Sequence, residues 1–460
     1  MPNTSVIVIL IISFFASVTF NGFFRNLAKN YNVLIDIPDK SRKFHFRATP
    51  LTGGISIYVA ALVSALLLAS LTSVSFEANI SERGLMKELG PNETNISRSY
   101  EVNEKNYELE IEKNNTENTV SINLNGPNKE NTTVKVVQNN DGYFEVILPT
   151  GETQTYKYDN GSVTLVSEVE SQPIIPKLLN TPRINVDTTT LSMFICGALI
   201  ILVMTFDDLF EIRASIRIIL QACIATLMVI LSDETITNLG NILGEGDIIL
   251  PMIWSEVFTV FCIVGIMNAY NMSDGLNGIC ASFGLIPLVF IGFAGPVHYG
   301  TIILMGILLG FLAYNLGWLG KKRRAFLGDS GSNSIGFAIA VLCIYYSQGY
   351  SSSGYVINPV TALWLVAIPL LDCIGVMTSR AIKGVMPFRP GRDHFHHKLL
   401  DYGLSPKKIL LIYIALTFAL CSFGMLLNQL YPNKEYISFA AFIIFSIMFY
   451  TLTRKKVANV

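Results

Sequence analysis

Charged residues are scarce in this chain. Lys, Arg, Asp and Glu make up 15% of its 460 residues, whereas soluble domains average about 25%. Apolar side chains account for 51% of the sequence, and the mean hydropathy is +0.46. This composition excludes an ordinary water-soluble enzyme and favours a protein that is embedded in a membrane.

Paired cysteines and metal-binding cysteine motifs are also missing. The seven cysteines occur singly, one in each of seven apolar stretches, and none lies in the polar block from 76 to 188. Their spacing fits neither a disulfide framework nor a zinc site, so we expect them to be small core residues.

Charge is distributed unevenly along the chain. Residues 76–188 hold 18 acidic and 10 basic side chains, a net charge of −8, and the remainder carries +7. Within this block the segments YELEIE, TVSINLN, TVKVVQ, YFEVILP and SVTLVSE are separated by Asn-, Asp- and Gly-rich turns. Alternation of this kind predicts a small β-rich domain. A disordered Asn-rich loop is the alternative, because few aromatic residues are available for a core.

Long apolar runs are abundant outside that block. A membrane-spanning helix needs about 20 mostly apolar residues. Eleven stretches approach or reach this length, near 5–24, 51–73, 189–206, 214–232, 253–271, 277–295, 299–318, 332–349, 359–379, 408–427 and 436–453. The first stretch lacks the basic start of a secretory signal peptide and is followed by Arg25 and Lys29, so we expect it to be retained. The pattern predicts an all-α polytopic membrane protein with about 11 transmembrane helices.

The basic residues predict the orientation, because cytoplasmic loops collect Lys and Arg. With the N-terminus outside and the C-terminus cytoplasmic, 22 of the 33 basic residues fall in inside segments and 10 in the acidic block. The other outside loops hold only Lys434. The expected organisation is therefore residues 1–75 with two helices and a cytoplasmic loop, 76–188 as an extracytoplasmic insertion, and 189–460 with helices 3–11 and cytoplasmic catalytic loops.

Ionisable residues gather at the predicted cytoplasmic face. Four segments carry them: FDDLFEIRASIR (206–217), NAYNMSDGLNG (268–278), FLGDSGS (326–332) and PFRPGRDHFHH (387–397). Charged groups near membrane helices are costly and usually functional. A single Asp could simply cap a helix, but four such segments on one face favour a catalytic site. Carboxylates beside Asn and Gly suit Mg²⁺, whereas the His cluster lacks zinc-ligand spacing and suits phosphate and sugar contacts better.

These motifs, together with DIPDKSRKFHFRATPLTGG (36–54), resemble the polyprenyl-phosphate N-acetylhexosamine 1-phosphate transferases. Within that family the bacterial undecaprenyl-phosphate N-acetylglucosaminyl 1-phosphate transferases are most similar. The resemblance covers all eleven predicted helices and excludes 76–188. It implies transfer of a sugar 1-phosphate from a UDP-sugar to a lipid phosphate with release of UMP, and a requirement for Mg²⁺ or, as a substitute, Mn²⁺.

The resemblance also implies roles for individual residues. The implied catalytic residues are Asp207, Asp208, Asp274, Asp329 and His394. The implied substrate-binding residues are Lys43, His45, Asn268, Asn271, Arg392, His396 and His397, and the implied metal ligands are Asp329, Asn271 and Asp274. Asn277 departs from the family, in which many members have Asp, and an amide cannot carry the same charge.

The expected function is therefore transfer of N-acetylglucosamine 1-phosphate to undecaprenyl phosphate in a bacterial inner membrane, as the first membrane step of cell-surface polysaccharide synthesis. Direct attack by the acceptor phosphate is favoured over a covalent intermediate. The expected partners are UDP-N-acetylglucosamine, undecaprenyl phosphate and the bilayer, with a homodimer as a further candidate and no nucleic acid. Alternatives are another UDP-amino-sugar donor, a transporter, for which intramembrane Asp372 would be a coupling group, and a receptor acting through the β-rich block.

Overall fold

The computed structural model of the chain describes residues 3–37, 48–71, 188–294, 299–348, 354–386 and 391–454. Only strands are described between 73 and 186 and at 350–351. The chain divides into two compact units. The first comprises residues 1–77, 181–349 and 355–460, and the second comprises 78–180 with 350–354.

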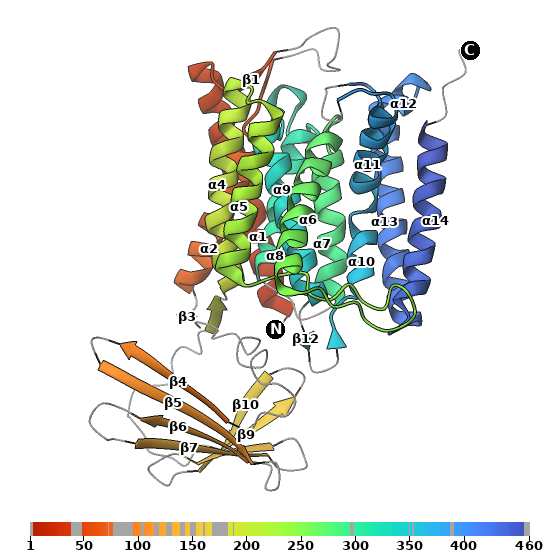
Figure 1. Cartoon of the computed structure of the whole chain (residues 1–460). Helices are drawn as coiled ribbons and strands as arrows, with labels where there is room; N and C mark the ends of the chain where they lie inside the picture. The colour runs from red at the N-terminus through yellow and green to blue at the C-terminus, as the bar shows by residue number, and fades with distance from the viewer. Residues whose placement is uncertain are drawn as a thin grey trace. The chain divides into compact units, whose positions relative to one another are not determined.

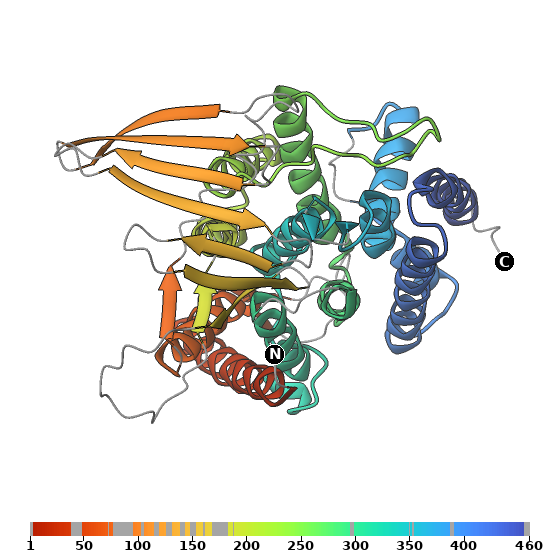
Figure 2. The same ribbon diagram turned by 90° about the horizontal axis from the view of Figure 1, so that it is seen from below.

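The first unit is a bundle of long helices that run side by side (Figures 1 and 2). Its helices are α1 (Asn3–Tyr31), α2 (Gly53–Leu71), α4 (Thr188–Phe210), α5 (Ala214–Ser232), α6 (Met252–Ser273), α7 (Ile279–Ala294), α8 (Tyr299–Asn315), α9 (Gly328–Gln348), α10 (Pro359–Leu365), α11 (Ala367–Ile382), α12 (Phe395–Asp401), α13 (Pro406–Leu430) and α14 (Glu435–Arg454). A short 3₁₀ turn, η1 (Lys321–Arg323), precedes α9.

The described helices support a multi-pass membrane protein. By length and composition six of them can cross a membrane, and the bent pair α10 and α11 brings the number to seven. Three further apolar helices in the described part of the chain are shorter: α7, α8 and the Gly53–Leu68 part of α2. Helix α9 begins with the polar sequence GDSGSNS, which lowers its hydropathy. The expected count of eleven spans therefore stays a prediction.

The ninth apolar stretch, expected near 359–379, is broken into two helices. Helices α10 and α11 meet at Val366 with a bend of 79°. Pro369 has no backbone N–H to donate to the carbonyl of Leu365, and its ring crowds that carbonyl. The Cys421 thiol lies 3.8 Å from the freed Leu365 oxygen instead. The proline therefore explains a bend that apolar length alone does not predict.

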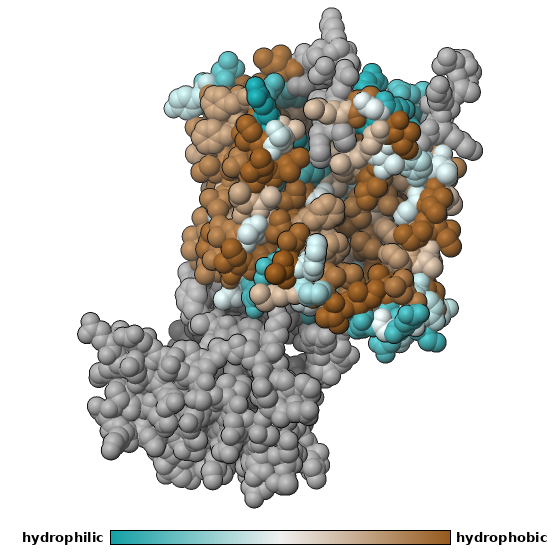
Figure 3. Space-filling model, in the orientation of Figure 1, coloured by the Kyte–Doolittle hydropathy of each residue, from teal (hydrophilic) through white to brown (hydrophobic). Residues whose placement is uncertain are grey.

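The outer surface of the bundle is apolar and its interior contains polar groups. Figure 3 shows hydrophobic residues covering the side of the bundle, with hydrophilic ones toward its two ends. Phe15 and Ile444, on α1 and α14, are among many exposed large apolar side chains. Inside, Gly306 and Gly310 of α8 let α1 approach so closely that an added Cβ would lie 2.6 and 2.7 Å from α1 carbonyl oxygens. This small-residue spacing is typical of helix packing in membranes.

The second unit contains a seven-stranded antiparallel sheet in which the strands follow one another in chain order, from β4 to β10. The strands are β4 (Asn95–Val102), β5 (Lys105–Asn114), β6 (Thr119–Asn125), β7 (Asn131–Gln138), β8 (Tyr143–Ile147), β9 (Thr153–Asp159) and β10 (Ser162–Ser167). Five of them coincide with the alternating segments of the sequence, whereas β4 and β9 are more polar and carry little alternation.

Three small strand pairs belong to the connections. In the first unit β1 (Ile35–Asp36) pairs with β2 (Thr49–Pro50), and β3 (Ser73–Phe76) pairs in parallel with β11 (Arg183–Val186). Strand β12 (Tyr350–Ser351) pairs with β13 (Gly354–Tyr355). The β3–β11 pair brings the two ends of the 78–180 segment together at the first unit.

Candidate functional site

The N-terminus of α9 is capped by a carboxylate from another helix. Asp208, near the end of α4, accepts hydrogen bonds from the backbone N–H groups of Asp329 and Ser330 at 2.8 and 3.1 Å. A carboxylate here satisfies amides that lack partners within the helix. Gly328 allows this approach because it has φ +73°, and a Cβ there would lie 2.8 Å from Asp208 Oδ2. Asp208 therefore fixes where α9 begins.

Asp329 then points away from its own helix terminus. Its Oδ1 accepts a hydrogen bond from Asn271 Nδ2 at 3.0 Å, and its Oδ2 lies 3.2 Å from the Arg217 guanidinium. Arg217 also binds Asp207 at 2.9 Å. Asp207 is 5% exposed and accepts a second hydrogen bond from the Ile212 backbone N–H. One guanidinium thus joins the carboxylates of α4 and α9.

Three buried amide side chains form a hydrogen-bonded chain that ends at the backbone of Asp329. Asn268 donates to Gln221, Gln221 donates to Asn333, and Asn333 donates to the backbone oxygen of Asp329, each at 2.7 Å. Gln221 and Asn333 are fully buried, and Asn268 is 6% exposed. A buried polar chain whose members are hydrogen-bonded fixes the relative positions of the helices that carry it. Here it links α5, α6 and α9.

Helix α11 holds the histidine segment at two points. Asp372 accepts hydrogen bonds from the Phe395 backbone N–H at 3.0 Å and pairs with His394 Nδ1 at 2.9 Å. Two turns later Arg380 binds Asp393 with distances of 2.5 and 2.9 Å. Burial alone raises the pKa of the Asp393 carboxyl, but the hydrogen bonds and charge of Arg380 outweigh it and lower the pKa. The segment is therefore fixed by two buried ionisable residues of one helix.

His396 packs against a glycine of the segment that follows α6. A Cβ on Gly275 would lie 2.0 Å from His396 Nε2, so only glycine fits at this position. His396 is 2% exposed, and its Nε2 is buried with no hydrogen-bond partner in the described part of the chain. Burial first, and then the charge of His397, lower the pKa of His396 to about 3. At neutral pH His396 is uncharged.

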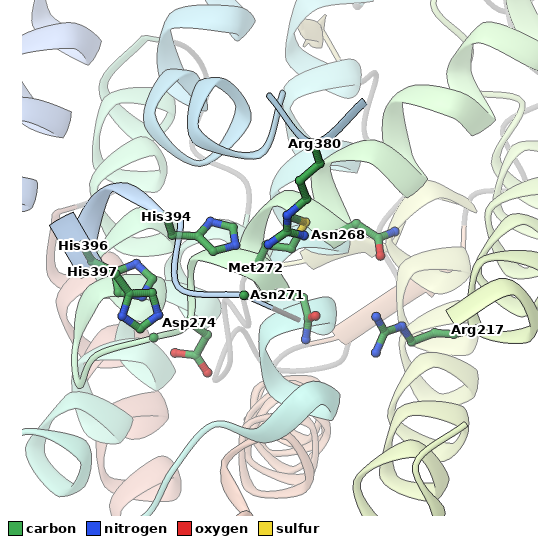
Figure 4. Close-up of a pocket in the computed structure, with 11 residues that line it drawn as sticks. Arg217, Asn268, Asn271, Met272, Asp274, Arg380, His394, His396 and His397 are labelled. Atoms are coloured by element: carbon green, nitrogen blue, oxygen red, sulfur yellow. The ribbon is translucent and has the colours of Figure 1, made fainter. Parts of the chain in front are cut away.

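These elements enclose a cavity of about 310 Å³ (Figure 4). Its lining residues come from α5, α6, α11, α12 and their connections: Arg217, Asn268, Asn271, Met272, Asp274, Gly275, Arg380, Gly391, His394, His396 and His397. Figure 4 shows Arg217 and the three histidines on opposite sides, with Asn271 and Asp274 between them. Anion-binding and cation-binding groups thus share one space.

The carboxylates suit a hard cation. Burial first, and then the nearby charges of Asp329 and Asp208, raise the pKa of Asp274 to about 7. Such crowding of carboxylates is relieved by a bound cation. Asp274, Asp329 and the Asn271 amide are oxygen donors of the kind that Mg²⁺ uses together with substrate phosphates. Among the residues that the structure describes, no group of three or more His, Cys, Asp or Glu forms a complete metal site by itself.

The structure places most of the residues implied by the sequence near one another. Asn268, Asn271, Asp274, His394, His396 and His397 line the cavity, and Asp207, Asp208 and Asp329 lie beside it. Lys43 and His45 lie outside the described residues. Arg392 is not among the lining residues, and its guanidinium lies 3.4 Å from exposed Asp401. Asn277 donates to the backbone oxygen of Asn315 at 3.1 Å and supports a turn.

Arg217 and Arg380 line the cavity but were not selected by sequence reasoning. Each is a single basic residue at the end of a predicted span, where positive charge is common at cytoplasmic ends. The signal that could have marked Arg217 is its place in FDDLFEIRASIR, ten residues after Asp207. Arg380 follows Asp372 by eight residues on one helix, so both lie on similar sides of α11.

The chain is similar in sequence to a known family and to named proteins of other bacteria. The family "Glycosyl transferase family 4" matches residues 190–347. A protein of Escherichia coli (strain K12) named "Undecaprenyl-phosphate alpha-N-acetylglucosaminyl 1-phosphate transferase" is 30% identical over 256 residues, which cover 54% of this chain and 68% of the relative. A protein of Haemophilus influenzae with the same name is 36% identical over 256 residues, which cover 54% of this chain and 70% of that relative. The family match includes the segments that carry Asp207, Asp274 and Asp329.

Proposed function

The chain belongs to glycosyl transferase family 4 and is a phosphoglycosyltransferase, and on that premise we propose that it transfers N-acetylglucosamine 1-phosphate from UDP-N-acetylglucosamine to undecaprenyl phosphate. The products are undecaprenyl-diphospho-N-acetylglucosamine and UMP. The relatives' names support undecaprenyl phosphate as the acceptor and N-acetylglucosaminyl 1-phosphate as the transferred group. The observation that carries the proposal is the cavity in which Arg217, Asn271, Asp274 and the His394 segment meet.

In this reaction an oxygen of the acceptor phosphate attacks the sugar-linked phosphorus of the donor. A new P–O bond forms there, the P–O bond to the uridine phosphate breaks, and UMP leaves with that bond's electron pair. The acceptor phosphate is largely ionised at neutral pH and needs little base catalysis. Mutual repulsion of the anionic groups is the main barrier to their approach. Cations in the site reduce it.

Three groups of residues around the cavity can each help to offset the repulsion between the donor and acceptor phosphates. Asp274, Asp329 and Asn271 would hold Mg²⁺, which supplies charge neutralisation of the diphosphate when bound. Arg217 provides a fixed positive charge between Asp207 and Asp329. Asp372 engages Nδ1 of His394 and orients the ring, which leaves Nε2 as the nitrogen that can contact a donor phosphate.

The same proposal includes the setting of the enzyme. We infer an inner-membrane protein with eleven spans, the N-terminus and the insertion at 76–188 outside, and the cavity at the cytoplasmic face. Two observations support this orientation. The first is the distribution of basic residues over the predicted loops. The second is that α12 and the C-terminal end of α1 lie at the same end of the bundle (Figure 1).

Purified enzyme incubated with undecaprenyl phosphate and a series of radiolabelled UDP-sugars tests the reaction and the donor together. We expect Mg²⁺-dependent formation of labelled lipid and unlabelled UMP with UDP-N-acetylglucosamine. A preference for another UDP-amino sugar would retain the reaction and correct the donor. Absence of lipid product with every donor, in protein that remains folded, would contradict the proposed reaction.

A further inference from the structure

A second cavity, of about 280 Å³, lies apart from the catalytic one and shares no lining residue with it. It is lined by Lys29 at the end of α1, by Ala48 and Thr49 at β2, and by Lys321, Lys322 and Arg324 in and after η1. Strand β1, which pairs with β2, lies at the same end of the bundle as α12 (Figure 1). The cavity therefore opens on the membrane face that also carries the catalytic site.

The lining is strongly positive. Four of its six described lining residues are basic, and none of these six is acidic. The carboxylate-bearing Asp36 lies opposite Thr49 in the β1–β2 register, and together with the six lining residues it leaves the described group net positive. Cations gathered in one small cavity repel one another, and a bound anion removes that repulsion.

Contacts beside the cavity hold its basic residues in place, and one guanidinium donor is left unused. Arg25 and Lys29 both donate to the carbonyl oxygen of Lys322, at 2.9 and 3.4 Å, which fastens η1 to α1. Arg324 lines the cavity, and its Nε is buried with no hydrogen-bond partner within the described residues. An unpartnered buried donor costs free energy that an acceptor such as a phosphate oxygen recovers.

Apolar side chains place the same cavity at the boundary between lipid and water. Trp318, three residues before Lys321, is 68% exposed. Leu27 and Phe23, one and two turns before the end of α1, are also exposed. Exposed Trp at the end of a membrane helix is typical of the headgroup region. Lysines at this depth extend their ammonium groups toward phosphates of the lipid surface.

We propose that this cavity binds the phosphate-bearing headgroup of an anionic phospholipid. Lys29, Lys321 and Lys322 supply the positive charge, Arg324 lines the same wall, and the Thr49 hydroxyl can donate a hydrogen bond to a phosphate oxygen. The acyl chains would lie along the exposed apolar surface of α1 beside Phe23 and Leu27. The site is separate from the reaction cavity, and its occupancy does not depend on the proposed sugar donor.

The test uses the full-length protein purified in a neutral detergent and follows its thermal unfolding. The probes are dioctanoyl phosphatidylglycerol, dioctanoyl phosphatidylcholine and inorganic phosphate, each added to saturation. We expect phosphatidylglycerol to raise the Tm by about 3 °C or more, and phosphatidylcholine and phosphate to leave it unchanged. An equal rise with phosphatidylcholine, or with phosphate alone, would overturn the assignment to an anionic lipid.

A matched pair of variants locates the response. The site variant carries Lys29→Gln, Lys321→Gln and Lys322→Gln. The control variant carries Lys383→Gln, Lys407→Gln and Lys408→Gln, which remove the same charge from exposed residues outside the cavity. We expect the site variant to lose at least two thirds of the phosphatidylglycerol shift and the control to keep it. Equal shifts in the two variants would overturn the proposal.

A kinetic measurement distinguishes the lipid acceptor from a bilayer lipid as the occupant. In the site variant the KM for undecaprenyl phosphate should stay within about twofold of the parent, since the acceptor binds elsewhere. A tenfold or greater rise in that KM together with loss of the phosphatidylglycerol shift would place the acceptor phosphate in this cavity and overturn the proposal. Because the thermal shift needs no activity, failure of the proposed reaction would leave this test intact.

Discussion

At the scale of single residues, Asp329 poses a choice between helix cap and metal ligand. Its position in the first turn of α9 suits either role. In the structure the cap is provided by Asp208, which accepts the N–H groups of both Asp329 and Ser330. The Asp329 side chain is 40% exposed and faces Arg217 and Asn271. The geometry leaves this carboxylate available for a ligand.

Asp329→Asn should therefore lower turnover by about 10²-fold or more, because a hard-ion site loses a formal charge. The Tm without metal should change little, since the cap remains intact, and raising Mg²⁺ should recover part of the activity. Turnover at several Mg²⁺ concentrations and a thermal melt measure both effects. The matched variant Asp208→Ala, which removes the cap, should instead lower stability by about 1 kcal/mol. Near-parent turnover in a folded Asp329→Asn protein would assign the residue a structural role.

His396 makes stability depend on pH. Its pKa in the folded protein is about 3, below the ordinary value of 6.5, so the unfolded chain binds more protons between those pH values. The stabilising contribution of the neutral ring is present above pH 6.5 and is lost as the pH falls toward 3. When the pH is lowered from 7.5 to 5, the Tm of the parent should fall by about 3 °C relative to the Tm of His396→Gln. The same change in Tm with pH for the parent and the variant across this range would contradict the prediction.

At the scale of elements, α11 acts as the support of the histidine segment. Asp372 and Arg380 lie eight residues apart on α11, and they bind His394 and Asp393 respectively. This arrangement connects a buried helix to side chains that line the cavity. The transporter alternative requires a coupling role for Asp372, but the Asp372 carboxylate is engaged by the His394 ring and the Phe395 N–H. The contact favours a positioning role for Asp372.

Asp372→Asn should reduce kcat/KM by about 10- to 100-fold, as is usual for residues that orient a functional His. An amide can still accept the Phe395 N–H but presents N–H or a weaker acceptor to His394. The pH profile of kcat/KM should shift while the KM for the lipid acceptor stays near the parent's. Asp401→Asn, which alters an exposed pair with Arg392, is the matched control and should be close to the parent. An equal change in kcat/KM in the two variants would contradict a positioning role for Asp372.

At the scale of the whole molecule, the orientation in the membrane can be tested from two described segments. Glu245 lies in the connection between α5 and α6, and Ser405 precedes α13; both are exposed. In intact cells an impermeant thiol reagent should label a cysteine at Glu245 and not one at Ser405, because the basic loops are predicted to be cytoplasmic. Native cysteines are first replaced by Ser or Ala. The reverse pattern would overturn the proposed orientation.

The described residues that line the cavity of the candidate site all belong to the first unit. Replacing residues 80–180 by a short Gly/Ser linker should leave transferase activity in detergent within about twofold of the parent, since chain closure between β3 and β11 costs little. Activity per milligram of correctly inserted protein is the measurement. A large loss in a variant that still inserts would show that residues 80–180 contribute to catalysis. The boundaries of the insertion and its position outside the membrane stay predictions. The homodimer also stays a prediction.

The sequence by itself determined the local features of this protein. Runs of apolar residues are sufficient to predict helices in a membrane protein, because the lipid solvent acts on each segment separately. The alternating segments of 107–168 likewise coincide with strands. The motifs around Asp207, Asp274, Asp329 and His394 predicted a shared candidate site, because charge near a membrane is costly wherever it occurs.

Only the tertiary structure decided which groups act together. Asp208 and the Asp329 amide are separated by 121 residues, and Arg217 and Asp329 by 112. No local pattern shows that one carboxylate caps α9 while the next one faces the cavity. Hydrogen bonds and desolvation depend on distances of a few ångströms between distant segments, so partner choice emerges only when the helices pack.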